Sequence, residues 1–218
     1  MALKTTLNYS PNFNPKKRTP KQIKFIIFHY TGMKNESDAI SKLTEIQSEV
    51  SCHYLIKNNG EILKMVPDLY IAWHAGKSLW KNYKSLNQSS IGIEITNPGH
   101  EHGYKKFTKK QISSILKLSK FLMNKYKVNP KNILGHSDIA ILRKKDPGEK
   151  FPWEYLSKNK VGIWHTLKNK DLIKNRKLKT SEEEEKFFYN NLFKIGYSKK
   201  TSRKTNKIKY LRELAKTF

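Results

Sequence analysis

Two histidines and one aspartate of this chain stand at positions where metal ligands commonly occur in α/β proteins. His29 follows the apolar run of residues 25–28, and His136 follows the short apolar run 133–135. Asp146 precedes a Pro-Gly turn, which could bring its carboxylate back over the same strand ends. Functional groups gather beyond the carboxyl ends of such strands, and two neutral imidazoles with one carboxylate are a usual ligand set of catalytic Zn²⁺. From spacing alone an alternative stays open, in which Asp146 caps the turn and both histidines are buried donors.

Two further residues carry groups suited to acid–base chemistry. Residues 90–96 alternate strictly, so Glu94 points away from the face that carries three isoleucines. Beside a metal, such a glutamate is a candidate general base, although an ordinary solvent-facing strand residue shows the same pattern. Lys144, two residues before Asp146, could place an ammonium near a developing oxyanion. Because lysine is abundant in this chain, its position alone is weak support for that role.

The elements that must position these residues alternate between strands and helices. We expect a central strand at 24–29, a helix at 37–50, a hairpin of 53–57 with 61–66, and strands at 90–96 and 133–136. The helix at 37–50 would bury Ile40, Leu43, Ile46 and Val50. A second helix follows the capping box of Thr108 and Gln111. This order predicts an α/β fold in which helices flank a mixed central β-sheet.

The chain divides into three segments by composition. Residues 1–22 are polar and punctuated by proline, which predicts an extended arm packed on the main domain. Residues 23–165 form the α/β domain. Residues 166–218 are basic and hold a cluster of aromatic residues, which predicts a small C-terminal helical module of two or three short helices docked on that domain.

Composition restricts the class of protein. The 218 residues carry 44 Lys+Arg against 18 Asp+Glu, a net charge of +26, and a single cysteine, Cys52, which excludes a disulfide scaffold. The charge favours polyanionic surroundings, but no nucleic-acid-binding motif accompanies it, so no specific nucleic-acid partner is expected. No segment reaches the roughly 20 apolar residues of a membrane span. Residues 1–20 lack the apolar core of a signal peptide, so we expect a cytoplasmic protein, or a periplasmic one if a leader has been removed.

Several motifs, taken together and in order, resemble those of the type 2 N-acetylmuramoyl-L-alanine amidases, in particular the AmiD/AmpD branch, which is related to T7-type lysozyme and the peptidoglycan recognition proteins. The resemblance covers about residues 8–165. The motifs are 28–31 (Phe-His-Tyr-Thr), 51–56 (Ser-Cys-His-Tyr-Leu-Ile), 72–76 (Ala-Trp-His-Ala-Gly), 90–95 (Ser-Ile-Gly-Ile-Glu-Ile), 135–140 (Gly-His-Ser-Asp-Ile-Ala), 143–148 (Arg-Lys-Lys-Asp-Pro-Gly) and 151–153 (Phe-Pro-Trp).

The resemblance implies one Zn²⁺ per chain, a role for each candidate residue, and an activity. His29, His136 and Asp146 would hold the ion. Glu94 would be the general base and acid, Lys144 would stabilise the oxyanion, and His74 would line the substrate cleft. The implied reaction is hydrolysis of the amide between N-acetylmuramic acid, or its anhydro form, and L-alanine of the stem peptide.

The implied partners are peptidoglycan fragments or muropeptides, in cell-wall turnover or recycling, and the sequence sets no oligomeric state. The C-terminal segment faintly resembles the helical peptidoglycan-binding module of the AmiD branch, in degenerate form. The alternative function is a non-catalytic peptidoglycan-recognition protein on the same fold.

Overall fold

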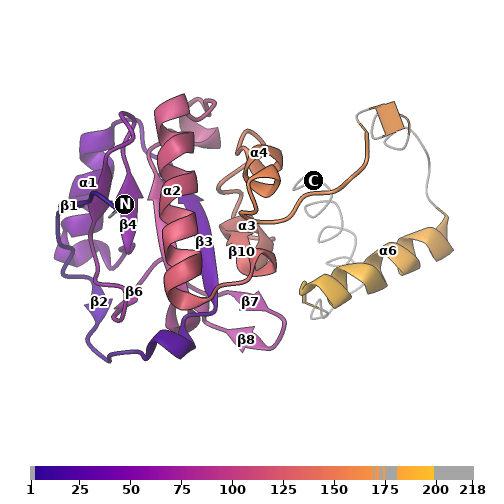
Figure 1. The fold of residues 1–218 in the computed structure, drawn as a ribbon, viewed down its shortest axis with the longest axis horizontal. Helices are drawn as coiled ribbons and strands as arrows, with labels where there is room; N and C mark the ends of the chain where they lie inside the picture. The colour runs from indigo at the N-terminus through magenta and orange to yellow at the C-terminus, as the bar shows by residue number, and fades with distance from the viewer. Residues whose placement is uncertain (1–2, 169, 172–173, 175–180, 199–218) are drawn as a thin grey trace.

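The strand expected at 24–29 forms as β3 (Phe25–Tyr30), an interior strand of a six-stranded sheet (Figure 1). The computed structural model describes residues 3–168, 170–171, 174 and 181–198. In the sheet β10, β3, β9 and β4 run parallel, β5 runs antiparallel to β4, and β1 lies parallel to β5 at the edge. The bounds of the other five strands are β1 Thr6–Leu7, β4 Tyr54–Ile56, β5 Ile62–Lys64, β9 Ser90–Ile95 and β10 Ile133–Gly135. The mixed α/β fold predicted from the sequence is confirmed.

The long helix α2 (Lys109–Tyr126) covers one face of the sheet (Figure 1). It begins with the predicted capping box, in which Thr108 and Gln111 satisfy each other's backbone N–H groups. The alternation of β9 supplies the apolar side chains that this helix covers. The core on this face includes Ile26, Phe28, Ile91, Ile93, Ile95, Ile115, Leu118 and Leu122.

The opposite face of the sheet is covered by shorter elements. Under α1 (Glu36–Thr44) lie Leu55, Leu63 and Met65, while Phe25 and Ile27 of β3 pack against residues of α3 (His136–Ile139) and α6 (Glu182–Ile195). Helix α4 spans Trp153–Lys158. Two further pairs of strands are β2 (Phe13–Asn14) with β6 (Ile71–Ala72) and β7 (Leu79–Trp80) with β8 (Tyr83–Lys84). Short 3-10 turns are η1 Pro20–Gln22, η2 Ile46–Ser48, η3 Leu86–Ser89, η4 His100–His102 and η5 Pro130–Asn132.

The helix predicted for 37–50 is wrong at its end. Helix α1 stops at Thr44, and Ile46 is 63% exposed although its spacing suggested a buried position. The side-chain amide of Asn12 donates hydrogen bonds to the carbonyl oxygens of Glu45 and Val50, at 2.8 and 3.0 Å. These tertiary hydrogen bonds hold the segment in an irregular path that helical periodicity cannot reveal.

Residues 3–18 run as an extended arm that pairs with the domain at two places, through β1 and through β2. Arg18 fixes the end of this arm, because its buried guanidinium donates to the carbonyl oxygens of Asn87, Ser90, Asp68 and Tyr70. The arm therefore reaches the strand that carries Glu94 and the loop that precedes it.

Helix α6 contacts the main domain. Tyr189, Leu192 and Tyr197 pack in one cluster with Trp80, and the Tyr197 hydroxyl donates to Oδ1 of Asp138 at 2.6 Å. The other short helices expected in 166–218 lie largely outside the described residues. Within the described part of the chain, no helix has the length and apolar character that crossing a membrane requires.

Candidate metal centre and its cleft

The register of three parallel strands brings the candidate ligands and Glu94 to one edge of the sheet. His29 of β3 lies directly opposite Glu94 of β9, so their side chains project from the same face. Gly135, the last residue of β10, pairs with Phe28, which places His136 next to His29. The side chains therefore meet beyond the carboxyl ends of neighbouring strands, where sheets of this type commonly carry their sites.

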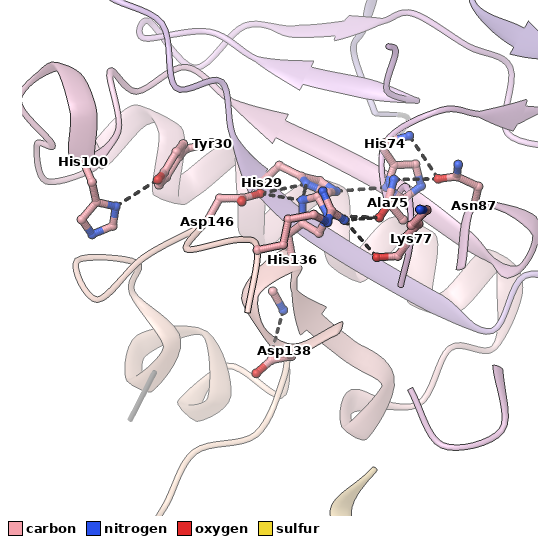
Figure 2. Close-up of polar contacts among 12 residues, drawn as sticks. His29, Tyr30, His74, Ala75, Lys77, Asn87, His100, His136, Asp138 and Asp146 are labelled. Carbon is pink, nitrogen blue, oxygen red and sulfur yellow. Dashed lines mark hydrogen bonds and ion pairs between the residues drawn. The ribbon is translucent and has the colours of Figure 1, made fainter. Parts of the chain in front are cut away.

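Three ligand atoms form a nearly equilateral triangle (Figure 2). Nδ1 of His29 and Nδ1 of His136 are 2.9 Å apart, and each lies 3.0 Å from Oδ2 of Asp146. In a tetrahedral Zn²⁺ site with metal–ligand bonds of about 2.0 Å, two ligand atoms lie roughly 3.3 Å apart. The distances between the three ligand atoms here are therefore only slightly shorter than in such a site. All three residues are buried, and within the described residues they are the group of His, Cys, Asp or Glu side chains whose geometry suits a metal ion. The donor set fits a divalent transition metal.

The electrostatics of the triangle favour the protonation states that a metal requires. Burial, with a smaller effect from the neighbouring His136, lowers the pKa of His29 to about 4, so the ring is neutral at pH 7. Burial alone would raise the pKa of Asp146, but the two facing imidazoles outweigh it and hold that pKa well below its ordinary range. A neutral imidazole and an ionised carboxylate are the ligand forms that bind a cation without first releasing protons.

Glu94 and Lys144 line the same cleft as the triangle, which has a volume of about 440 Å³. Oε2 of Glu94 is buried, and within the described residues no hydrogen-bond partner reaches it. Burial, and then the charge of Asp146, raise the pKa of Glu94 to about 8, against the opposing effect of the Lys144 ammonium. A carboxyl whose pKa lies near neutrality can both accept and return a proton.

His74 is nearly buried beside His29, with 9% of its surface exposed. Its Nδ1 lies 3.0 Å from Nε2 of His29 (Figure 2). Its Nε2 lies 3.1 Å from the hydroxyl of Ser90. His74 also forms part of the cleft wall, so the expected contribution to a substrate cleft stays a prediction. Both of its ring nitrogens, however, face protein groups.

Sequence reasoning missed a group of residues around His74. The carbonyl of Ala75 lies 3.1 Å from Nε2 of His136 and accepts from Arg143 at 3.0 Å. The side-chain oxygen of Asn87 accepts from the backbone N–H groups of His74 and Ala75 (Figure 2). A backbone carbonyl carries no residue-type signal, whereas Arg143 and Asn87 are polar residues whose partners only the fold reveals.

The opposite side of the cleft is formed by a short network. Nδ1 of His100 lies 2.9 Å from the Tyr30 hydroxyl, and its Nε2 lies 2.9 Å from the Glu149 carboxylate. Tyr104 stacks on His100 and donates its hydroxyl to the carbonyl of Pro147, the residue after Asp146. This network ties the loop that contains Asp146 to the turn after β9.

Comparison with known proteins adds independent information. The profile of the N-acetylmuramoyl-L-alanine amidase family matches residues 19–149, more than half of the chain. The chain is 37% identical over 155 residues to N-acetylmuramoyl-L-alanine amidase AmiD of Escherichia coli (strain K12), a match that covers 66% of this chain and 55% of AmiD. It therefore spans about half the length of that relative. It is 32% identical over 167 residues to 1,6-anhydro-N-acetylmuramyl-L-alanine amidase AmpD of Haemophilus influenzae, covering 68% of this chain and 88% of AmpD.

Two solved structures align with most or all of this chain. The complex of Escherichia coli AmiD with its substrate anhydro-N-acetylmuramic acid-L-Ala-D-γ-Glu-L-Lys aligns with a TM-score of 0.73 at 29% identity, over 94% of this chain and 80% of that one. AmpDh3 of Pseudomonas aeruginosa, in complex with anhydromuramic pentapeptide, aligns with a TM-score of 0.76 at 27% identity, over 100% of this chain and 87% of that one.

Proposed function

This chain belongs to the N-acetylmuramoyl-L-alanine amidase family, and from that premise we propose that it is a zinc-dependent amidase of cell-wall turnover or recycling. The bond cleaved is the amide between the lactyl group of N-acetylmuramic acid, or of its 1,6-anhydro form, and the L-alanine of the stem peptide. AmiD and AmpDh3, which resemble this chain, have been captured with anhydromuramyl peptides. The proposal extends that substrate class to this protein.

The observation that carries the proposal is that a metal-ligand triangle and Glu94 line one cleft, and that Oε2 of Glu94 has no hydrogen-bond partner among the described residues. His29, His136 and Asp146 offer two nitrogens and one oxygen within 3.0 Å of one another, and Glu94 stands opposite His29 in the next strand. A cleft carboxyl whose pKa is raised to about 8 is typical of acid–base catalysts, and this favours an enzyme over a protein that only binds its ligand.

Each residue has a distinct part in the proposed reaction. His29, His136 and Asp146 hold Zn²⁺, which when bound polarises a carbonyl and lowers the pKa of water from 15.7 to about 7. In its ionised form, which the Lys144 ammonium favours, Glu94 accepts the proton of the attacking water and delivers it to the amine of L-alanine as that amine leaves. Lys144, which lines the cleft, places its ammonium near the oxygen that gains negative charge.

Mass spectrometry of purified anhydromuropeptides incubated with the protein tests the proposal. We expect loss of the intact substrate and appearance of a free peptide that begins with L-alanine, together with the peptide-free sugar. A chelator should abolish the reaction, and added Zn²⁺ should restore it. The matched control is Asp146→Ala, which removes one member of the triangle.

Other outcomes identify other functions. Muropeptide binding without cleavage by the zinc-loaded protein supports a recognition protein and overturns the proposal. Products cut between amino acids indicate a peptidase, and release of acetate indicates a deacetylase. The cytoplasmic location and the peptidoglycan-binding role of residues 166–218 stay predictions.

A further inference from the structure

Both histidines of the triangle have their second ring nitrogen against the same short turn, His74–Ala75 (Figure 2). For His136 the partner is the carbonyl oxygen of Ala75, at 3.1 Å from Nε2. Nη2 of Arg143 lies 3.3 Å from the same nitrogen, but its two N–H groups are donated to the carbonyl oxygens of Ala75 and Lys77, at 3.0 Å each. A carbonyl can only accept a hydrogen bond, so Nε2 of His136 carries the proton that it donates to Ala75. The lone pair of its neutral ring then lies on Nδ1, the atom that faces Asp146.

For His29 the same result follows from a chain of hydrogen bonds. The Ser90 hydroxyl lies 2.6 Å from the carbonyl oxygen of Leu86, and its only proton must be donated there. Its oxygen therefore accepts from Nε2–H of His74, at 3.1 Å. With the proton of the neutral His74 ring on Nε2, its Nδ1 accepts from Nε2–H of His29, at 3.0 Å. Nδ1 of His29 is left with its lone pair toward the triangle.

Contacts from other parts of the chain fix the turn His74–Ala75 in the position from which it meets His29 and His136. Oδ1 of Asn87 accepts from the backbone N–H groups of His74 and Ala75, at 3.1 and 2.7 Å. The His74 ring lies on Gly92, where an added Cβ would come within 2.3 Å of the ring. Arg143 donates to the carbonyl of Ala75. The ring and the carbonyl are thus fixed by contacts from three separate parts of the chain.

We propose that the turn His74–Ala75, supported by Ser90, is a positioning device that locks both histidine ligands in the Nε2–H tautomer with Nδ1 toward the metal. This inference rests on the proposed metal centre. It gives His74 the role of orienting the ligand His29, in place of a contact with the substrate. Groups that orient metal-bound histidines commonly contribute 10- to 100-fold to metal affinity. Ser90 is fully buried and contacts His74, so its effect on the metal must pass through that ring.

Zinc affinity, measured by competition with a chromophoric chelator, tests the device without reference to turnover. We expect His74→Leu to weaken Zn²⁺ binding by about 10- to 100-fold, and His74→Asn, which keeps an acceptor near Nδ1, to recover part of the loss. Ser90→Ala should weaken binding by less than about tenfold. The control is Tyr126→Phe, which removes a buried hydroxyl of α2 that donates a hydrogen bond to Asp68. This substitution should leave Zn²⁺ affinity unchanged.

The wild-type protein supplies a second test that needs no variant. Long-range ¹H–¹⁵N correlation spectra of the zinc-loaded, histidine-labelled protein should show the Nε2–H tautomer at His29, His74 and His136. An Nδ1–H tautomer at His74 overturns the inference. So does unchanged Zn²⁺ affinity in both His74→Leu and Ser90→Ala, above all if His74→Leu raises KM instead. Failure of the wild-type protein to bind Zn²⁺ would refute the proposed function itself.

Discussion

One substitution, Glu94→Gln, should move stability and turnover in opposite directions. The pKa of Glu94 rises from 4.5 to about 8 in the folded protein, because burial and the charge of Asp146 both disfavour the ionised carboxylate. At 1.36 kcal/mol for each pH unit, ionising this carboxyl in the folded state costs at most roughly 5 kcal/mol. Since part of the side chain reaches the cleft, we expect roughly 2–3 kcal/mol after solvent screening.

The sign of the effect follows from proton counts. Between pH 4.5 and about 8 the folded protein holds a proton at Glu94 that the unfolded chain has lost, so the free energy of unfolding falls as pH rises through this window. Glutamine has nothing to ionise. The metal-free Glu94→Gln variant should therefore match the wild type near pH 4.5, become progressively more stable than it toward pH 8, and keep a constant advantage above that.

Urea unfolding in the presence of a chelator, repeated across this pH range, measures the difference. The control is Glu45→Gln, the same substitution at an exposed side chain, for which we expect little change at any pH. In the zinc-loaded protein, Glu94→Gln should retain one ion per chain and lose roughly 10²- to 10⁴-fold in turnover. A stability difference that does not vary between pH 4.5 and 8 would refute the account of a buried, proton-holding carboxyl, and full turnover would remove Glu94 from the reaction.

Three further substitutions test separate parts of the structure. Gly92→Ala should lower the free energy of unfolding by about 1–3 kcal/mol and weaken Zn²⁺ binding, because its Cβ would collide with the His74 ring; unfolding and chelator competition that both match the wild type would contradict this. Lys144→Ala should keep the metal and lower kcat/KM by about 10²-fold in steady-state kinetics, and unchanged kinetics would exclude the ammonium from the reaction. Leu192→Ala, at a buried contact with the Trp80 cluster, should accelerate amide hydrogen exchange in α6 and leave β3 protected, whereas unaltered exchange in α6 would show that this contact does not hold the helix.

The elements that the sequence predicted well are those whose pattern is local. Strict alternation at 90–96 gave β9, a polar turn with Gly60 between apolar runs gave the hairpin of β4 and β5, and a capping box gave the start of α2. The end of α1 could not be predicted in this way, because it depends on Asn12, which lies more than thirty residues away in sequence.

In the candidate site, too, local patterns reveal some residues, whereas others are recognised only in the folded structure. His29, His136 and Glu94 could be singled out because each lies in or directly after a recognisable strand, and Asp146 because it precedes a turn. The support behind them depends on atoms that have no signature in the sequence. The carbonyl of Ala75 is chemically the same as every other backbone carbonyl, and only the three-dimensional path of the chain places it against His136.

The register of β9 links the stability of the core to the geometry of the site. The alternation that buries Ile91, Ile93 and Ile95 under α2 is the same alternation that directs Glu94 into the cleft opposite His29. A slip of one residue would send the carboxyl into the core and the isoleucines into the cleft. Burial of each isoleucine stabilises the native register by roughly 1.5–3 kcal/mol. The three isoleucines together therefore disfavour the slipped register more strongly than the single carboxyl does. The position of Glu94, the proposed general base, is therefore determined by the hydrophobic face of its strand, and conservative changes on that face should preserve the site even where they loosen the core.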